Sequence, residues 1–189
     1  MINNLGKSFI VYTASNLLSS ALPYILLPFL TFALTNEDYG ILSNFTGLIA
    51  LIVPLIGINF SSAYSRQYFN DKIDIKSYVG NGFLINLFFT SLLTLLFFLF
   101  DDFIHIKTGV HSFYIRLLAF YCFSNCISDI LLTKWRLEDK FWAFGGIRVI
   151  KTIIEVFLTL ILILKFKMDY EGRIIGIFLS SFTFLIPVV

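Results

Sequence analysis

Three charged side chains share one face of an otherwise apolar stretch at residues 146–164. Successive helical residues turn by about 100°, so Arg148, Lys151 and Glu155 fall within an arc of about 80°. With a rise of about 1.5 Å per residue, Glu155 lies about 14 Å from the start of the stretch. That depth is near the middle of a hydrocarbon core about 30 Å thick, so this stretch predicts a charged membrane span.

A charged side chain facing lipid at that depth costs about 2.5 to 3.5 kcal/mol, so the face is predicted to look into a helix bundle or a watered cavity. Thr152 and Thr159 fall on the same face. Ionisable groups inside a membrane are candidates for a functional site. The alternative is that Lys151 and Glu155, four residues apart, neutralise each other in a packed bundle. The sequence leaves both interpretations open.

The composition is that of an integral membrane protein. Of the 189 residues, 58% are hydrophobic and 14% are charged, whereas soluble domains carry about 25% charged residues. The net charge of +2 and the scattering of the basic residues exclude nucleic acid as a partner. No nucleophile with a base, phosphate loop or metal cluster occurs, so we expect no enzyme and no cofactor.

Six apolar runs predict an all-α, polytopic transmembrane bundle of six spans. The predicted spans are Ser8–Leu34, Ile41–Ala63, Tyr78–Phe100, Ser112–Thr133, Gly146–Leu164 and Ile174–Val189. The predicted connections are a turn at Asn36–Gly40, longer links at Ser65–Ser77 and Asp101–His111, a hairpin at Lys134–Lys140 and a basic link at Lys165–Arg173. Pro23 and Pro28 should bend the first span.

Small and polar residues mark two spans for close packing or for lining a cavity. Tyr12, Asn16 and Ser19 recur at helical spacing in the first span, and Ser15 pairs with Ser19 four residues on. Either packing or a cavity would suit this stripe. In the sixth run, small residues recur at every fourth position and predict packing against another helix: Gly172, Gly176 and Ser180. That run stops after 16 residues, and we therefore expect residues 1–189 to be one transmembrane domain of a longer protein.

Cys122 and Cys126 lie in an apolar run and are predicted to be small buried residues. His105 and His111 receive no role. Lysine and arginine counts place nine basic residues on one side and five on the other, which favours an N-terminus in the cytoplasm. In that topology Asp129 lies at a depth similar to Arg148 and Lys151, and we predict that it pairs with one of them.

Four stretches together are similar to a known family. They are LLPFLTFALTNEDYGILSNFTGLI (residues 26–49), GINFSSAYSRQYFND (57–71), LLTKWRLEDKFWAFGGIRVIKTIIE (131–155) and YEGRIIGIFLSSF (170–182). The ensemble resembles the Wzx-like polysaccharide exporters and lipid-linked oligosaccharide flippases. These proteins resemble the multidrug and toxic-compound exporters, in which two helical lobes face a central cavity. The resemblance implies that this chain is the first lobe and that the second is absent from it.

The resemblance also implies a substrate and a location. A polyprenyl diphosphate carrying sugars would move from the inner to the outer leaflet of a bacterial plasma membrane, for a polysaccharide such as O-antigen or capsule. The implied partners are the lipid-linked oligosaccharide, membrane lipids and a polysaccharide polymerase. Arg66 matches the family's motif position. The substrate-binding candidates are Arg66, Arg148, Lys151, Glu155, Asp129 and Asn16.

Two other functions remain open at this point. A cation-coupled multidrug antiporter of the same superfamily would often place an acid in the first span, and Ser8–Leu34 has none. A membrane scaffold that transports nothing is the alternative from another class. Loss of a scaffold need not make lipid-linked sugars accumulate, whereas loss of a flippase should.

Overall fold

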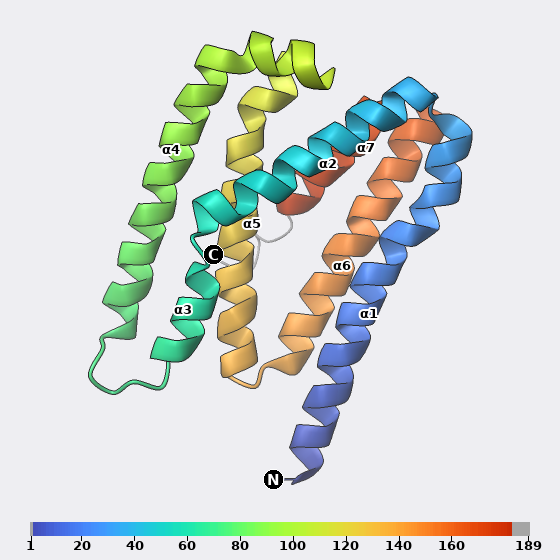
Figure 1. Ribbon diagram of the computed structural model, residues 1–189. Helices are drawn as coiled ribbons and strands as arrows, with labels where there is room; N and C mark the ends of the chain where they lie inside the picture. Colours follow the sequence, from blue (N-terminus) through green and yellow to red (C-terminus); the bar gives the residue numbers. More distant parts are fainter. Residues whose placement is uncertain (1, 183–189) are drawn as a thin grey trace. The chain divides into compact units, whose positions relative to one another are not determined.

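The computed structural model describes residues 2–182, and helices make up nearly all of this part of the chain. The elements in chain order are α1 Ile2–Ala33, α2 Asn36–Gly57, α3 Phe60–Gln67, α4 Ile75–Thr108, α5 Ser112–Leu137, α6 Phe141–Leu160, the π-helical turn η1 Ile161–Lys165 and α7 Tyr170–Ser181 (Figure 1). The predicted all-helical class is confirmed.

Four stretches are long and apolar enough to cross a membrane: Gly6–Ala33, Asn36–Gln67, Ile75–Thr108 and Ser112–Leu137. They correspond to the first four predicted spans. α6 and α7 follow as the fifth and sixth. α6 differs from these four because its three charged residues, Arg148, Lys151 and Glu155, lie in the middle of a 20-residue helix, and α7 is described over 12 residues. The order of helices thus agrees with a six-span bundle.

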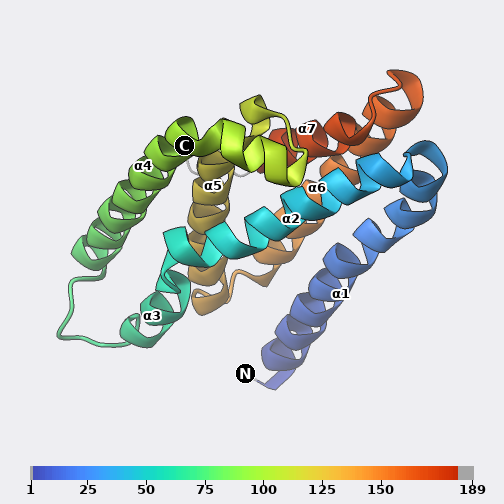
Figure 2. The same cartoon turned by 45° about the horizontal axis from the view of Figure 1, so that its top comes forward.

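The chain forms two compact units. One unit combines the first 40 residues with the stretch from Trp135 onward, and so contains α1, α6, η1 and α7. The other is Ile41–Lys134, with most of α2 and all of α3, α4 and α5. In the first unit α1 and α6 lie side by side, and α7 packs on α6. In the second, α3 continues from α2 at an angle, as Figure 2 shows.

α1 contains both prolines of the first predicted span. Proline has no N–H to donate and its ring crowds the preceding turn, so each one weakens the helix locally. Figure 1 shows the axis of α1 changing direction, as the sequence predicts.

The predicted turn at Asn36–Gly40 is wrong, because α2 already begins at Asn36. Thr35 and Asp38 cap its N-terminus reciprocally. The Asp38 backbone N–H donates to the Thr35 hydroxyl oxygen at 3.2 Å, and the Asp38 carboxylate accepts from the Thr35 backbone N–H at 3.2 Å. The polar residues therefore start a helix, and the link between α1 and α2 is short.

The predicted connection at Asp101–His111 is also largely helix, because α4 continues to Thr108. Phe100 has φ −120° and ψ 15°, so the predicted end of the span is a kink within α4. Just after it, the buried Asp101 carboxylate forms an ion pair with Arg116 of α5. That partner allows a carboxylate to lie inside the helix pair.

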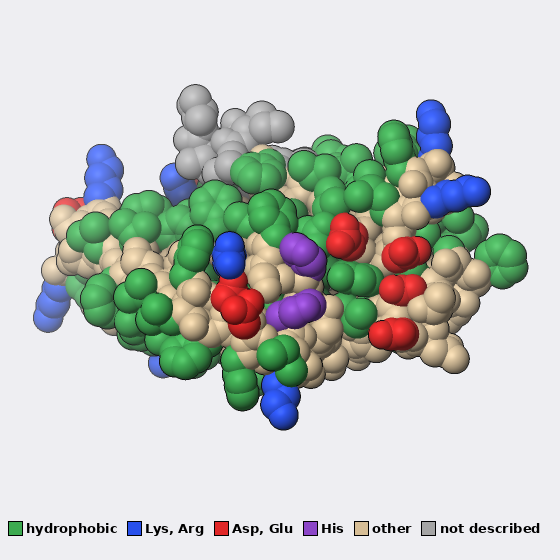
Figure 3. All heavy atoms as spheres, turned by 90° about the horizontal axis from the view of Figure 1, so that it is seen from above, with side chains coloured by type: hydrophobic (Ala, Val, Ile, Leu, Met, Phe, Trp, Pro, Cys, Tyr) green, Lys and Arg blue, Asp and Glu red, His purple; other side chains and the backbone are tan. Residues whose placement is uncertain are grey.

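Gly109, with φ 72°, ends α4 in the left-handed conformation that glycine adopts without strain. The two histidines lie next to each other at this link, as Figure 3 shows. Their ring centroids are 6.3 Å apart, and His105 Nδ1 lies 2.8 Å from the Val110 carbonyl oxygen.

Three other helix ends extend beyond the predicted ends of their spans. α5 runs to Leu137, which shortens the hairpin, and α4 begins at Ile75 after an Asp74 cap. α7 begins at Tyr170, so Arg173 lies in a helix and not in a connection. The predicted end of the sixth span at Val189 lies outside the described residues.

Candidate functional site

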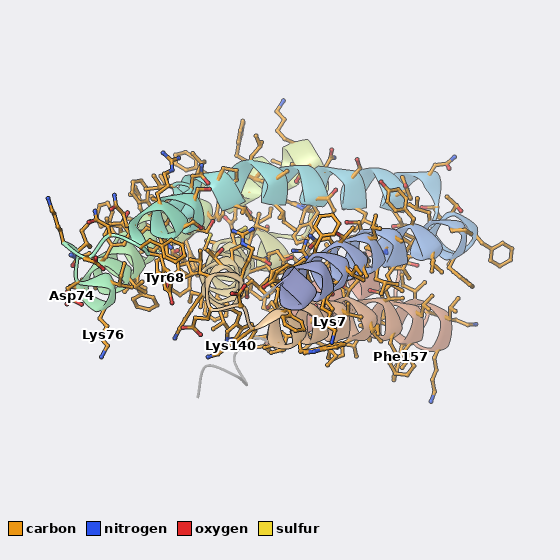
Figure 4. The ribbon with its side chains drawn as sticks, turned by 90° about the horizontal axis from the view of Figure 1, so that it is seen from below. Lys7, Tyr68, Asp74, Lys76, Lys140 and Phe157 are labelled. Carbon is orange, nitrogen blue, oxygen red and sulfur yellow. The ribbon has the colours of Figure 1, made fainter. Side chains whose placement is uncertain are left out.

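α6 holds the predicted charged face and separates it from an apolar face. Arg148, Lys151 and Glu155 are half-buried on one side of the helix. On the other side Ile153 and Phe157 are 50% and 62% exposed. Figure 4 shows Phe157 pointing outward from α6. The apolar face suits lipid, and the charged face is shielded by protein, as the cost of a lipid-facing charge requires.

The base at the start of this face, Arg148, lies next to an aromatic ring of the same helix. Thr152 and Thr159 are buried, and the Thr152 hydroxyl donates to the Arg148 carbonyl oxygen at 3.0 Å. The Arg148 guanidinium lies 5.8 Å from the centroid of the Phe144 ring, within cation–π range. The ring therefore helps to hold a positive charge within a membrane helix.

Glu155 forms an ion pair with Arg173, which the sequence predicted to lie in a connection and not in a helix. Arg173 Nη2 of α7 lies 2.8 Å from Glu155 Oε1, and Arg173 Nη1 donates to the Thr159 hydroxyl oxygen at 3.1 Å. The Arg173 and Glu155 side chains are only 12% and 18% exposed. The acid on the charged face is thus paired between helices. A helical wheel begun at Tyr170 would have placed Arg173 on α7 beside its small-residue ladder.

Small residues bring the helices of this unit into close contact. A Cβ at Gly176 of α7 would lie 3.3 Å from the Thr159 Cα and 3.2 Å from its backbone nitrogen. A Cβ at Gly145 of α6 would collide with the Ser15 hydroxyl oxygen of α1. The predicted ladder of the sixth run therefore packs on α6, and Ser15 also serves helix packing.

The other polar residues of α1 divide between packing and exposure. The Tyr12 ring meets Phe144 edge to face at a centroid distance of 5.0 Å, and its hydroxyl lies 3.5 Å from the Arg136 carbonyl oxygen. Asn16, a predicted substrate-binding residue, is exposed. The stripe is therefore partly a packing surface, and Asn16 remains available to a ligand.

The second unit contains a break within a membrane-crossing stretch. α2 ends at Gly57 and α3 begins at Phe60, with Ile58 and Asn59 at φ 41° and 52° between them. Pro54 lies one turn before the break. A Cβ at Gly57 would lie 3.2 Å from the Cys126 sulfur, so a small residue suits this close approach to α5. The single second span of the sequence prediction is thus two helices.

A cavity of about 430 Å³ lies at this break. Residues from α2, α3, α4 and α5 line it, including Ser61, Asn86 and Asp129. Asn86 is 2% exposed, and its Nδ2 has no hydrogen-bond partner among the described residues. A buried donor left in this state costs about 1–3 kcal/mol, so it marks a position that serves something other than stability. Asn86 is one of two asparagines, with Asn81, in the uncharged predicted span Tyr78–Phe100.

Asp129 and Arg66 belong to this second unit. Asp129 borders the cavity, and Arg66 is exposed in the last turn of α3. The structure thus gathers Arg148, Lys151 and Glu155 on one helix, and Asn16 belongs to the same unit. The predicted pairing of Asp129 with Arg148 or Lys151 stays a prediction. Cys122 and Cys126 are both buried free thiols, as predicted.

Comparison with known proteins defines the family. The sequence model of the family described as "Polysaccharide biosynthesis protein" matches residues 5–187, almost the whole chain. The chain belongs to this family. It is also 24% identical over 180 residues to protein 1 of the Lsg locus of Haemophilus influenzae. That alignment covers 93% of this chain and 42% of the relative, so the chain spans about two fifths of the relative's length. No solved structure matches.

Two polar regions of this family member lie in membrane helices: the charged face of α6 and the break between α2 and α3. This family member is a membrane protein with charged residues in the middle of one helix, α6, and an interrupted span at α2–α3. Transporters place their sites in such features, because polar groups and unwound backbone at membrane depth are tolerated only where they line a cavity or are buried.

Proposed function

We propose that this chain forms the first of two lobes of a flippase. Its substrate would be a polyprenyl diphosphate carrying an oligosaccharide, for O-antigen or capsule-like polysaccharide synthesis. The flippase would move this lipid across the bacterial plasma membrane, with the N-terminus of the chain in the cytoplasm. The observation that carries the proposal is the charged face of α6, where Arg148 and Lys151 lie half-buried in a helix whose other face is apolar.

The chemistry of the substrate explains the two bases. A diphosphate is anionic, and arginine and lysine form charge-assisted hydrogen bonds to phosphate oxygens. Arg148 would offer a planar fork, and Lys151, one turn farther along, a compact ammonium group. Arg66, exposed at the end of α3, is a third candidate base.

Glu155 would keep the binding of the diphosphate reversible. A transporter must release its substrate, and an acid one turn from Lys151 weakens the local attraction for anions. The Arg173 guanidinium already neutralises part of this acid through the 2.8 Å ion pair. Exchange of Arg173 between Glu155 and a phosphate would couple binding to movement of α7 against α6. Glu155→Gln should therefore strengthen binding of the diphosphate and slow its release.

The experiment that tests the function is a flipping assay on the full-length protein in proteoliposomes, with a short-chain polyprenyl diphosphate sugar. Movement of the sugar into the protected leaflet supports the proposal. Deletion of the gene should also make lipid-linked sugar accumulate in cells. Cation-driven drug efflux without flipping would favour the multidrug antiporter, and neither activity, without accumulation, would favour the scaffold.

The proposed orientation has its own test. Asn36 and Asn70 are both exposed, at the start of α2 and in the link between α3 and α4. Single cysteines at these positions, in a cysteine-free background, would be treated in whole cells with an impermeant thiol reagent. We expect labelling at position 36 and none at position 70. The reverse result would place the N-terminus outside.

A further inference from the structure

The break between α2 and α3 is the feature that the proposed function leaves unused. Ile58 is β-branched and has φ 41°, a conformation that such residues rarely adopt. Strained backbone persists where the surrounding structure holds it, and it gathers at binding sites. The break lies within the stretch Asn36–Gln67, which is apolar enough to cross a membrane. Unwound backbone there must be buried or line a cavity, and here it lines one.

The cavity contains a donor that lacks an acceptor. Asn86 of α4 is 2% exposed and lines the cavity, and its Nδ2 has no hydrogen-bond partner within residues 2–182. An amide nitrogen donates two hydrogen bonds and accepts none. A ligand at this point must therefore present an oxygen with a lone pair.

The same cavity contains acceptors. Asp129 of α5 contributes a carboxylate, and Ser61 of α3 contributes a hydroxyl group that both donates and accepts. A cation would suit Asp129 but not the Asn86 amide nitrogen, and an anion would suit the amide but not the carboxylate. A hydroxyl group satisfies both, since it donates to one and accepts from the other.

Apart from Asn59 and Cys126, the remaining residues that line the cavity are apolar. Val53, Phe60 and Ile130 line the cavity. The Phe60 ring is held in place because it stacks on Tyr78 at a centroid distance of 5.4 Å and lies against Gly82, where a Cβ would collide with it. A volume of about 430 Å³ is within the range of small-molecule sites, about 300–1,000 Å³. Apolar walls with a few convergent polar groups suit a compact polyhydroxylated ring.

We propose that the α2–α3 break binds one sugar residue of the substrate, with Asn86 donating to a sugar hydroxyl group and Asp129 accepting from one. This inference takes its ligand class from the proposed function and adds a second site, separate from the bases of α6. The glycan would thereby be recognised by hydrogen bonds, and the diphosphate by charge.

Cysteine protection tests the site directly. Ser61→Cys is introduced into an otherwise cysteine-free full-length protein, with Cys122→Ala and Cys126→Ser. The rate of alkylation by N-ethylmaleimide is measured in the presence of glucose, galactose, mannose or N-acetylglucosamine. Parallel samples contain sodium chloride or inorganic pyrophosphate. At least one sugar should slow labelling, about twofold when its concentration equals the dissociation constant. Sodium and pyrophosphate should not.

Two asparagine variants separate binding from structure. Asn86→Leu should keep the basal labelling rate and lose the protection by sugar. Asn81→Leu, at an exposed position of the same helix, should keep both. If Asn86→Leu misfolds, Asp129→Asn gives a second test, since it keeps the shape and should weaken protection.

The outcomes test the sugar site and the flippase separately. Absence of protection by every sugar, equal protection in Asn86→Leu, or protection by sodium or pyrophosphate alone would overturn the sugar site. None of these results would affect the flippase, which is measured by lipid movement. Protection by sugar in a protein that flips no lipid would retain the sugar site and reject the flippase.

Discussion

The two units treat polar groups inside membrane helices in opposite ways. In the first, Glu155 of α6 forms an ion pair with Arg173, and small residues allow α1 and α7 to pack closely on α6. In the second, the helix is interrupted and the Asn86 amide nitrogen beside the break has no partner among the described residues. The difference indicates that the first unit neutralises its acid, Glu155, within the fold, whereas the second leaves the Asn86 amide nitrogen for a ligand.

Breaking the ion pair of the first unit should have the largest effect on stability. Arg173→Met leaves Glu155 mostly buried without its base, and removal of one partner of a buried pair costs about 3–5 kcal/mol. Thermal unfolding in detergent should show a large loss. The double variant Glu155→Gln/Arg173→Met should recover much of it, because no charge remains to be compensated. Unchanged unfolding of Arg173→Met would show that the pair does not support the fold.

The helix contact between α1 and α6 offers a matched pair of glycines. Gly145→Val should collide with Ser15 and destabilise the protein by about 1–3 kcal/mol, the usual cost of overpacking. Gly146→Val serves as the control, since apart from its chain neighbours and the nearby backbone of α6 nothing lies within 4 Å of the position of its Cβ. Equal unfolding temperatures for the two variants would contradict the packing of α1 on α6.

In the second unit, removal of the polar side chain of Asn86 should not lower the stability of the fold. Asn86→Leu removes a buried donor without a described partner, and we expect stability to stay the same or to rise by about 1 kcal/mol. Thermal unfolding without ligand measures it, with exposed Asn81→Leu as the control. A clear loss of stability would mean that Asn86 supports the fold, and the contrast between the units would then fail.

The smallest effect concerns the N-terminus of α4, where Asp74 and Lys76 precede the predicted span Tyr78–Phe100. Figure 4 labels both residues. The Ser77 hydroxyl and the Lys76 backbone N–H donate to the Asp74 carboxylate and hold its pKa below the usual value. A lowered pKa in the folded state means that this capping contributes fully above the unfolded pKa and is lost as pH falls through the folded one. The protection of the first-turn amides of α4, taken as the intrinsic exchange rate at each pH divided by the observed rate, should therefore fall on acidification.

Asp74→Asn is the control for that exchange measurement. Asparagine caps a helix about as well as aspartate but has no carboxyl group to titrate. The variant should keep the cap and lose its pH dependence in this range. An identical pH profile in the variant would show that another group is responsible.

The sequence predicted the helical class, the span order and the charged face of α6, because each depends on composition or on helical periodicity. Boundaries were less accurate where polar residues continue a helix. Asp101 was assigned to a connection, since nothing local indicates that Arg116 of the next helix would pair with it. For the same reason the sequence did not predict the pairing of Arg173, whose partner Glu155 lies on α6.

The break at Ile58 and Asn59 was missed for a different reason. The predicted second span contains Pro54 and Gly57, but propensity does not say whether a long apolar run bends or separates into two helices. That outcome depends on tertiary contacts, such as the close approach of Gly57 to Cys126 and of Phe60 to Gly82. Asn86 was visible in the sequence, but its missing partner required three-dimensional positions.

The most direct test of the proposed function is the flipping of a polyprenyl diphosphate sugar by Lys151→Ala. The full-length variant would be compared with Lys165→Ala, an exposed lysine beyond α6, at equal protein abundance in the membrane. The proposal predicts that Lys151→Ala abolishes flipping, that Lys151→Arg retains part of it and that Lys165→Ala is unaffected. Normal flipping by Lys151→Ala at normal abundance would contradict the assignment of the α6 face to the substrate and would leave Lys151 as part of a packed charged cluster.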